Sequence, residues 1–546
     1  MAIKKPKIAV NPPVFFTSSG LLVLFLLFGA IFTDTASDVF PAALDFVSTR
    51  FGWFYILSVA FFIGFAVWLV FSRYATVRLG PDDSRPEFST PTWFSMLFSA
   101  GMGIGLLFYG VAEPIMQYSN PPVGQGETPA AAEMALPLTY FHWGIHAWAV
   151  YVLMALAIAY FSFRRQLPLA IRSAFYPLLG ERIHGSIGHV IDIIAVFGTT
   201  FGLATSLGLG SLQINAGLNY LFPESVPDAV STQLIIIAVI TGAATISLVT
   251  GVDKGIRRLS ELNMIIAALL MVFVFVVGPT LFILNSFTEH VGSYLQTFVQ
   301  RTFWTDSLGD GEWNKSWTLF YWGWWIAWSP FVGMFVARIS RGRTIREFIL
   351  GVALVPTIVT FVWLSVFGDT AIYLELFEGG GIARAVSNDV DTAIYVMLEK
   401  LPLAALTSLL AATVVAVFFV TSSDSASFVV DMLTSGGHPD PPVWQRVFWA
   451  VTEGCVAGVL LAAAGKSGLD ALQAAVVTIG LPFCVCLVIM VFSLMRGLRD
   501  ELEPSEQDVH APATSQTAAA EATSEMPAPK ASEQAATPMA RQELVD

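Results

Sequence analysis

Long apolar runs, separated by short polar segments, dominate this chain. A helix needs about 20 predominantly apolar residues to cross a bilayer, and the chain offers a run of that length at twelve positions. The runs lie near residues 14–34, 52–72, 90–112, 137–161, 187–213, 230–251, 262–285, 317–337, 346–368, 403–422, 444–464 and 471–495. The pattern predicts an all-α polytopic membrane protein with twelve transmembrane helices.

Basic residues support this count because they gather in alternate loops, as the positive-inside rule expects. Of the 28 Lys and Arg residues, all but six fall on the N-terminal side of the membrane. The exceptions are Arg50, Arg301, Lys315, Arg384, Lys400 and Lys466. We therefore expect both termini on the cytoplasmic face of the membrane. The first run is too long for the core of a signal peptide and lacks a small-residue cleavage site, so it should remain as a helix.

Composition leads to the same class. The chain of 546 residues is 55% hydrophobic and only 13% charged, with a mean hydropathy of +0.67, which lies outside the range of soluble globular proteins. Part of the net charge of −13 comes from the acidic tail, residues 500–546, whose Ala, Pro, Ser and Thr predict a disordered cytoplasmic segment. Cys455, Cys484 and Cys486 lie in late spans and are predicted to be packing residues. We expect no nucleic-acid partner.

Three glycines, Gly101, Gly103 and Gly105, occupy alternate positions in the third run. Each glycine costs a helix interior about 1 kcal/mol relative to alanine, so three together predict an unwound or closely approached backbone. Close packing of small residues between helices is the alternative interpretation.

Aromatic residues are crowded into two runs. The eighth run carries Trp322, Trp324, Trp325, Trp328 and Phe331, and the fourth carries Trp143, Trp148 and Tyr151. At helical spacing, the rings of each cluster lie on one side of their helix. Interfacial aromatic belts are the alternative, but belts sit at span ends and these clusters run into the spans. The pattern favours an internal aromatic pocket.

Polar residues inside the apolar runs suggest one ion site and no metal centre. Thr421 and Ser422 end the tenth run, where hydroxyl groups are costly unless they face a cavity or a partner, and oxygen atoms of this kind suit sodium. A helix end reaching the membrane surface is the alternative. His142 and His146 lack a third ligand, and we find no nucleophile and base constellation. We therefore expect neither an enzyme nor a cofactor, with sodium as a coupling ion only.

The two interrupted runs, the third and the eighth, are five spans apart. A five-helix unit repeated once is inverted in the membrane, and broken helices then frame a site at the midplane. The predicted organisation is a cytoplasmic N-terminus (1–13), two peripheral helices (14–85), a first repeat (86–288), an outer amphipathic connector (289–315), a second repeat (316–499) and the acidic tail (500–546).

These motifs resemble those of the betaine/choline/carnitine transporter family over residues 10 to 500. The resemblance rests on Gly101–Gly105 with Tyr109–Pro114, on the pattern from His142 to Tyr151, and on Trp322–Phe331 leading into Arg338–Glu347. It implies a leucine-transporter-like fold of two inverted five-helix repeats after two extra N-terminal helices. It also implies a homotrimer in the lipid bilayer.

The resemblance also implies a substrate site. Trp143, Trp148, Tyr151 and Trp325 match the family's central aromatic box, and Trp322, Trp324, Trp328 and Phe331 are expected to line the path beside it, with Gly101, Gly103 and Gly105 contributing backbone. A quaternary ammonium has no N–H to donate, so a neutral cage of ring faces suits it through cation–π attraction.

A sodium site is implied in the same way. It would use the carbonyls of Ser99, Met102 and Phe418 with the hydroxyls of Thr421 and Ser422. A second sodium site in some members uses two threonines and a phenylalanine. Thr199 and Phe331 match that pattern, whereas Leu203 stands at the other threonine position, which puts the second ion in doubt.

Two departures narrow the expected activity to sodium symport of a betaine-like osmolyte. Gly105 stands where proton-coupled choline carriers tend to have Asp. No Lys or Arg occurs between Ile191 and Gly210, where carnitine exchangers place a basic side chain. A proton-coupled choline carrier and a carnitine-type exchanger remain the alternatives within the family, and a channel or ligand sensor is the alternative outside it. The choice among glycine betaine, a sulfonium analogue, proline betaine, ectoine and choline stays open.

Overall fold

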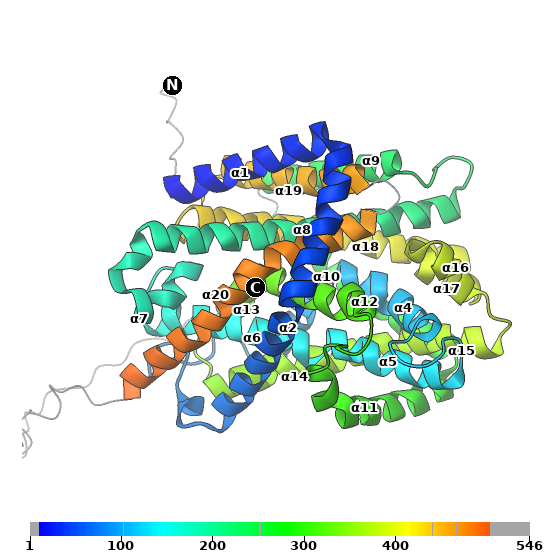
Figure 1. Ribbon diagram of the computed structural model, residues 1–546, viewed down its shortest axis with the longest axis horizontal. Helices are drawn as coiled ribbons and strands as arrows, with labels where there is room; N and C mark the ends of the chain where they lie inside the picture. The colour runs from blue at the N-terminus through cyan, green and yellow to red at the C-terminus, as the bar shows by residue number, and fades with distance from the viewer. Residues whose placement is uncertain (1–9, 102, 251–252, 439–440, 465–467, 503–546) are drawn as a thin grey trace, which may run out of the picture. The chain divides into compact units, whose positions relative to one another are not determined.

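Helices make up nearly all the regular structure in the computed structural model, which describes residues 10–101, 103–250, 253–438, 441–464 and 468–502 (Figure 1). The α-helices are α1 (Pro12–Ile31), α2 (Thr33–Phe71), α3 (Thr90–Gly101), α4 (Ile104–Ser119), α5 (Pro129–Trp143), α6 (Ile145–Ala159), α7 (Tyr176–Leu179), α8 (Ser186–Leu221), α9 (Val230–Thr250), α10 (Asp253–Val277), α11 (Thr280–Thr302), α12 (Glu312–Asn314), α13 (Phe320–Ile339), α14 (Ile345–Leu364), α15 (Thr370–Phe377), α16 (Ile382–Asn388), α17 (Ala393–Glu399), α18 (Ala404–Thr434), α19 (Val443–Ala464) and α20 (Gly468–Leu502). Three π-helical turns (Tyr160–Arg164, Lys315–Leu319 and Ser365–Asp369) and four 3-10 turns (Arg73–Thr76, Ile171–Phe175, Gly180–His184 and Val390–Thr392) join or extend them.

Ten helical segments among the described residues are long and apolar enough to cross a membrane. The two expected spans outside this set are 90–112, which is divided into α3 and α4, and 317–337, which corresponds to α13. The halves of the first are individually too short, and the Trp, Gly, Ser and Pro residues of α13 lower its hydropathy. The prediction of an all-helical polytopic membrane protein is confirmed.

The end of the seventh span differs from the predicted boundary. The apolar run extends to 285, but α10 ends at Val277 and α11 begins at Thr280. Gly278 and Pro279 separate the two helices, because the residue before a proline is disfavoured in helical conformation. The segment expected as an outer connector from residue 289 therefore belongs to a helix that begins nine residues earlier.

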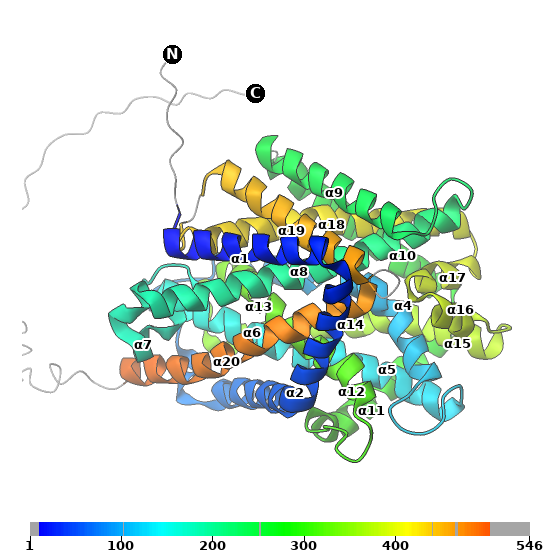
Figure 2. The ribbon, with the colours of Figure 1, turned by 45° about the horizontal axis from the view of Figure 1, so that its top comes forward.

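Helices from the two halves of the chain pack on one another. In Figure 2, α8, α18 and α19 run side by side. The third helix of each expected repeat packs on its counterpart, α8 on α18, and the fourth on its counterpart, α9 on α19. The crossed pairs α8 with α19 and α9 with α18 are also in contact. Helices at corresponding positions of the two expected repeats are therefore in contact, and the division into repeats stays a prediction.

Glycines allow the central helix α13 to approach its neighbours closely. A Cβ atom at Gly333 of α13 would lie 2.2 Å from Cγ of Met154 on α6, and one at Gly202 of α8 would lie 2.4 Å from Cδ1 of Trp328. Small residues at helix interfaces let backbones pack tightly in membranes, where van der Waals contact drives association. These contacts hold α13 between α6 and α8, so its tryptophans point into a shared interior.

The basic loop after α13 is part of the fold. The guanidinium of Arg343 lies 3.9 Å from the centre of the Trp93 ring and donates to the carbonyl of Phe88 at 3.0 Å. Thr344 and Glu347 form a capping box that begins α14, satisfying backbone N–H groups that would otherwise lack partners. The contacts described here belong to the unit formed by residues 1–496, and the second unit, 497–546, lies almost wholly outside the described residues.

Candidate functional site

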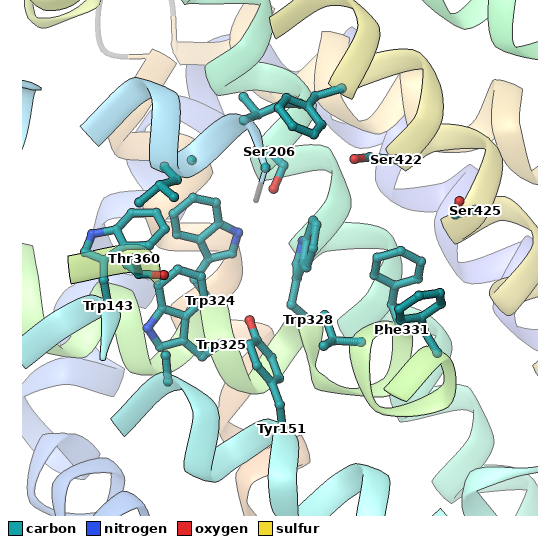
Figure 3. A pocket seen from close by; sticks show the side chains of 18 of the residues that line it. Trp143, Tyr151, Ser206, Trp324, Trp325, Trp328, Phe331, Thr360, Ser422 and Ser425 are labelled. Carbon is teal, nitrogen blue, oxygen red and sulfur yellow. The ribbon is translucent and has the colours of Figure 1, made fainter. Parts of the chain in front are cut away.

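A cavity of about 190 Å³ lies among α4, α6, α8, α13 and α18 (Figure 3). Seven aromatic residues expected at the substrate site line it: Trp143, Trp148, Tyr151, Trp324, Trp325, Trp328 and Phe331. Figure 3 shows the hydroxyl group of Tyr151 pointing into the space that the indole rings surround. None of the described residues that line it is charged. Its volume lies below the roughly 300–1,000 Å³ of drug-sized ligand sites, so it suits a compact molecule.

The break between α3 and α4 forms one wall of the cavity. α3 ends at Gly101 and α4 begins at Ile104, so the backbone is interrupted within the glycine motif, as its spacing predicts. Gly103, Ile104 and Gly105 line the cavity, and no side chain caps the start of α4. The first N–H groups of a helix have no intrahelical partner and carry the positive end of its dipole. This wall can therefore accept a negatively charged ligand group.

A second helix break positions Trp143. α5 ends at Trp143, Gly144 has φ −92° and ψ −136°, and α6 begins at Ile145. A Cβ at Gly144 would lie 2.6 Å from the carbonyl oxygen of Tyr140 and 2.9 Å from the ring of Phe361, so the break requires glycine. Trp148 and Tyr151, one turn apart on α6, are in edge contact with ring centroids 5.4 Å apart. Sequence periodicity predicted these rings but not the break between them.

Helix α13 supplies the facing wall. Trp324 and Trp325 stack with centroids 4.9 Å apart and an interplanar angle of 12°. Trp143 meets Trp325 edge to face at 5.0 Å, and Trp328 meets Phe331 in the same way at 5.2 Å. The N–H of Trp325 donates to the carbonyl of His142 at 2.9 Å, a group in the last turn of α5, where carbonyls lack intrahelical partners. The orientation of one cage ring thus depends on the end of another helix.

Trp322 lies elsewhere than the sequence placed it. Its ring is fully buried, stacks on His146 at 5.4 Å with an angle of 10° and contacts Phe141 at 5.2 Å. It is not among the described residues that line the cavity. At 100° per residue, the tryptophans from Trp322 to Trp328 spread over about 160° around the axis of α13. The side of α13 that carries Trp322 therefore packs on α5 and α6 and does not face the cavity.

The expected sodium residues on α18 face the same cavity. Phe418, Thr421 and Ser422 line it, and Figure 3 shows Ser422 and Ser425 on the side opposite Trp143. The hydroxyl of Thr421 donates to the carbonyl of Val417 at 3.0 Å, which leaves its oxygen lone pairs for a ligand. Met102 lies outside the described residues, as do the surroundings of Ser99 and Gly101.

Thr199, expected at a second ion site, is buried within α8. Its hydroxyl donates to the carbonyl of Ala195 at 2.9 Å, and Leu203 is also buried. Phe331 lines the cavity and Thr199 is not among its described lining residues. The structure thus does not bring the residues of this doubtful site together around the cavity.

The two histidines of the fourth span have separate partners. Nδ1 of His142 lies 2.5 Å from a carboxylate oxygen of Glu113, while Nε2 of His146 lies 2.8 Å from the hydroxyl of Thr302. In the part of the chain that the structure describes, no group of three or more His, Cys, Asp or Glu residues is placed to hold a metal ion.

Sequence reasoning missed several site residues that come from other helices. Ser206 on α8, Thr360 on α14 and Leu106 on α4 line the cavity. Glu113, which accepts the indole N–H of Trp143, falls within the motif Tyr109–Pro114, but sequence reasoning assigned it no role at the site. No local signal marks these residues, because the packing of distant helices brings them to the site.

Gly105→Ala is expected to distort the cage. The added Cβ would lie 2.5 Å from Cη2 of Trp324 and 3.0 Å from Cη2 of Trp143, so both rings must shift. Overpacking of this kind costs about 1–3 kcal/mol, and we expect ligand affinity, measured by tryptophan fluorescence titration, to fall about tenfold. Gly242→Ala, where nothing lies within 4 Å, is the matched control and should bind normally. Equal affinities in the two variants would contradict the proposed tight packing at this wall.

The fold and the cavity together define a multi-pass membrane carrier with an uncharged aromatic centre. The sequence profile of the "BCCT, betaine/carnitine/choline family transporter" family matches residues 13–503. The chain belongs to this family, and it is a transporter and not an enzyme.

Three curated relatives illustrate the similarity. The chain is 46% identical over 491 residues to the glycine betaine transporter OpuD of Bacillus subtilis, covering 89% of this chain and 94% of that protein. It is 44% identical over 488 residues to a probable glycine betaine transporter of Desulfitobacterium hafniense, covering 89% and 97%. It is also 44% identical over 502 residues to the high-affinity choline transport protein of Escherichia coli K12, covering 91% and 73%.

Proposed function

We propose that the protein takes up a zwitterionic quaternary ammonium or sulfonium osmolyte, such as glycine betaine, by sodium symport across the bacterial inner membrane. The observation that carries the proposal is the uncharged aromatic cavity. Each well-placed ring contributes about 0.5–2 kcal/mol to binding of a cation that has no N–H to donate. The glycine betaine transporters among the relatives support this substrate class.

The wall formed by the start of α4 favours a zwitterion over a simple cation. No Lys or Arg is among its described lining residues, so a substrate carboxylate would be received by the uncapped start of α4, where Gly103, Ile104 and Gly105 lie. Helix N-termini bind anionic groups through their N–H groups and dipole. Choline has a hydroxyl group in place of the carboxylate and would gain less from this wall, although one relative is a choline transport protein.

A second cavity supports release toward the loop that carries Arg338. It has a volume of about 570 Å³ and shares Phe331, Phe335 and Ser425 with the aromatic cavity. Arg338, Asp424 and Arg446 line it, so charged side chains appear along this route. The distribution of basic residues assigns this end to the cytoplasm. We propose that substrate and ion leave the cage along this route.

Coupling to one sodium ion would be sufficient for strong accumulation. A neutral zwitterion moving with one sodium ion carries one positive charge inward, which is worth about 2.3 kcal/mol per 100 mV. That energy corresponds to roughly fifty-fold accumulation before any sodium gradient is added. Among the described groups, we assign the hydroxyls of Thr421 and Ser422 and the carbonyl of Phe418 to the ion. We also propose that the protein forms the homotrimer expected from the family.

Uptake into proteoliposomes tests the proposed function. Radiolabelled glycine betaine should accumulate when an inward sodium gradient and an inside-negative potential are present, and accumulation should collapse when potassium replaces sodium. Competition by the sulfonium analogue, proline betaine, ectoine and choline would rank the substrates. Betaine transport that is indifferent to sodium would refute symport, and binding without any flux would favour a sensor.

A further inference from the structure

A buried carboxylate lies directly behind the aromatic cavity. Glu113 of α4 is completely buried and is not among the described residues that line the cavity. Its Oε2 accepts hydrogen bonds from the indole N–H of Trp143 at 2.9 Å and from the hydroxyl of Tyr321 at 2.6 Å. Its Oε1 lies 2.5 Å from Nδ1 of His142. One indole ring therefore separates this carboxylate from the ligand space.

The donors around Glu113 limit where protons can reside. An indole N–H can only donate, and the hydroxyl of Tyr321 also lies 3.1 Å from the same indole nitrogen as an acceptor, so its own proton is directed to Oε2. Oε2 therefore carries no proton. On the other side, we assign the proton between Oε1 and Nδ1 of His142 to the imidazole. Nε2 of His142, which lies 3.3 Å from the hydroxyl of Thr318, then accepts the proton of that hydroxyl. With these assignments the imidazole is neutral and the group carries one negative charge.

We propose that Glu113 is the remote counter-charge of the aromatic cage and sets its preference for a cationic headgroup over a neutral one. This inference rests on the proposed function and identifies a positioning residue for it. A negative charge in a buried site of low dielectric acts over several ångströms with little screening. The hydrogen bond from Trp143 to a carboxylate also makes that ring more electron-rich, which strengthens its attraction for a cation.

Placing the charge behind a ring has a chemical advantage over placing it in the cavity. A carboxylate in contact with the ligand would bind sodium, ammonium or a primary amine as well as a quaternary ammonium, because it can accept hydrogen bonds and coordinate ions. Because Glu113 lies behind Trp143, its negative charge attracts a cationic ligand electrostatically without touching it. The cavity then selects for a methylated cation by shape, and the buried carboxylate selects for its charge.

The competing explanation is that Glu113 only holds Trp143 and Tyr321 in place. Glu113→Gln separates charge from geometry. The amide oxygen can accept the same two hydrogen bonds that Oε2 accepts, from Trp143 and Tyr321. The amide N–H can donate to Nδ1 of His142 once the imidazole proton moves to Nε2. Tyr321→Phe is the matched control, because it removes one hydrogen bond to the same oxygen and keeps the charge.

The test compares two ligands of the same shape. Glycine betaine and tert-butylacetate differ only in having nitrogen or carbon at the centre of the headgroup, so their affinity ratio reports the contribution of the positive charge. We would measure both by tryptophan fluorescence titration of purified protein in nanodiscs. Glu113→Gln should lower the ratio about tenfold, mainly by weakening betaine, while Tyr321→Phe should retain the wild-type ratio. An affinity ratio is independent of the fraction of active protein.

Several outcomes would overturn the inference. An unchanged ratio in Glu113→Gln, or an equal fall in Tyr321→Phe, would assign Glu113 a purely structural role. His142→Gln, whose amide can still donate to Oε1, should leave the ratio unchanged. A higher betaine preference in His142→Gln would mean that a protonated His142 cancels the charge of Glu113 in the wild type, which would also refute the proposal. If Glu113→Gln does not fold, His142→Gln serves as the test. Wild-type protein that shows no preference for betaine would instead refute the proposed function.

Discussion

Trp325→Leu is expected to weaken glycine betaine binding roughly 30-fold to 150-fold, a loss of about 2–3 kcal/mol. The ring is almost fully buried, lines the cavity and stacks on Trp324 at 4.9 Å. Removing it takes away one cation–π surface and frees Trp324 to tilt into the space. Leucine also cannot donate to the carbonyl of His142, which accepts the indole N–H at 2.9 Å, so Trp143 at the end of α5 loses support as well.

The control for this prediction is a tryptophan that faces away from the cavity. Trp53 on α2 is 55% exposed within the chain, and its N–H bonds only to the carbonyl of Arg50 in its own helix. Trp53→Leu should bind and transport like the wild type. Binding by calorimetry and thermal stability should be measured together for both variants. A folded Trp325→Leu protein with wild-type affinity would remove this residue from the cage.

The double variant Thr421→Ala, Ser422→Ala is expected to raise the sodium concentration for half-maximal uptake at least about tenfold. Two of the oxygen atoms assigned to the ion would be lost, and hard cations depend on such oxygens. The fold should tolerate the change, because the hydroxyl of Thr421 donates only to carbonyls of its own helix, at 3.0 Å and 3.3 Å. Sodium titration of betaine uptake in proteoliposomes measures the effect.

Thr413→Ala on the same helix is the matched control. Its hydroxyl donates to the carbonyl of Leu409 at 2.8 Å and is exposed, so removing it should leave the sodium titration unchanged. If the double variant retained the sodium response of the wild type, the ion would have to bind elsewhere. If it transported betaine without any response to sodium, the hydroxyls would be confirmed as the coupling element.

Features carried by local sequence were predictable. The apolar runs predicted the spanning helices because spanning a bilayer demands length and apolarity. The three glycines from Gly101 to Gly105 predicted the break between α3 and α4, since glycine destabilises a helix interior. The spacing of Trp143, Trp148 and Tyr151 predicted rings on one side of a single helix. All three line the cavity, although Trp143 ends α5 and the other two lie on α6.

Features that depend on contact between distant segments were not predictable. Trp322 shares a helical arc with Trp325, yet one ring packs on His146 and the other lines the cavity. The seventh span was predicted to end at residue 285, because the apolar run continues past Gly278 and Pro279, whereas α10 ends at Val277. A helical wheel shows on which side of a helix each residue lies, but it does not show which other helix or cavity that side contacts.

The sequence alone thus determined the class of protein, the number of apolar spans and the side chains available for a cation cage, because these follow from composition and from periodicity within single helices. The tertiary structure decided which rings enclose the cavity and what lies behind them. Glu113, His142 and Tyr321 are far apart in the chain and meet only because α4, α5 and α13 pack together. A hydrogen bond between such segments has no local signature, since its geometry depends on how the helices cross.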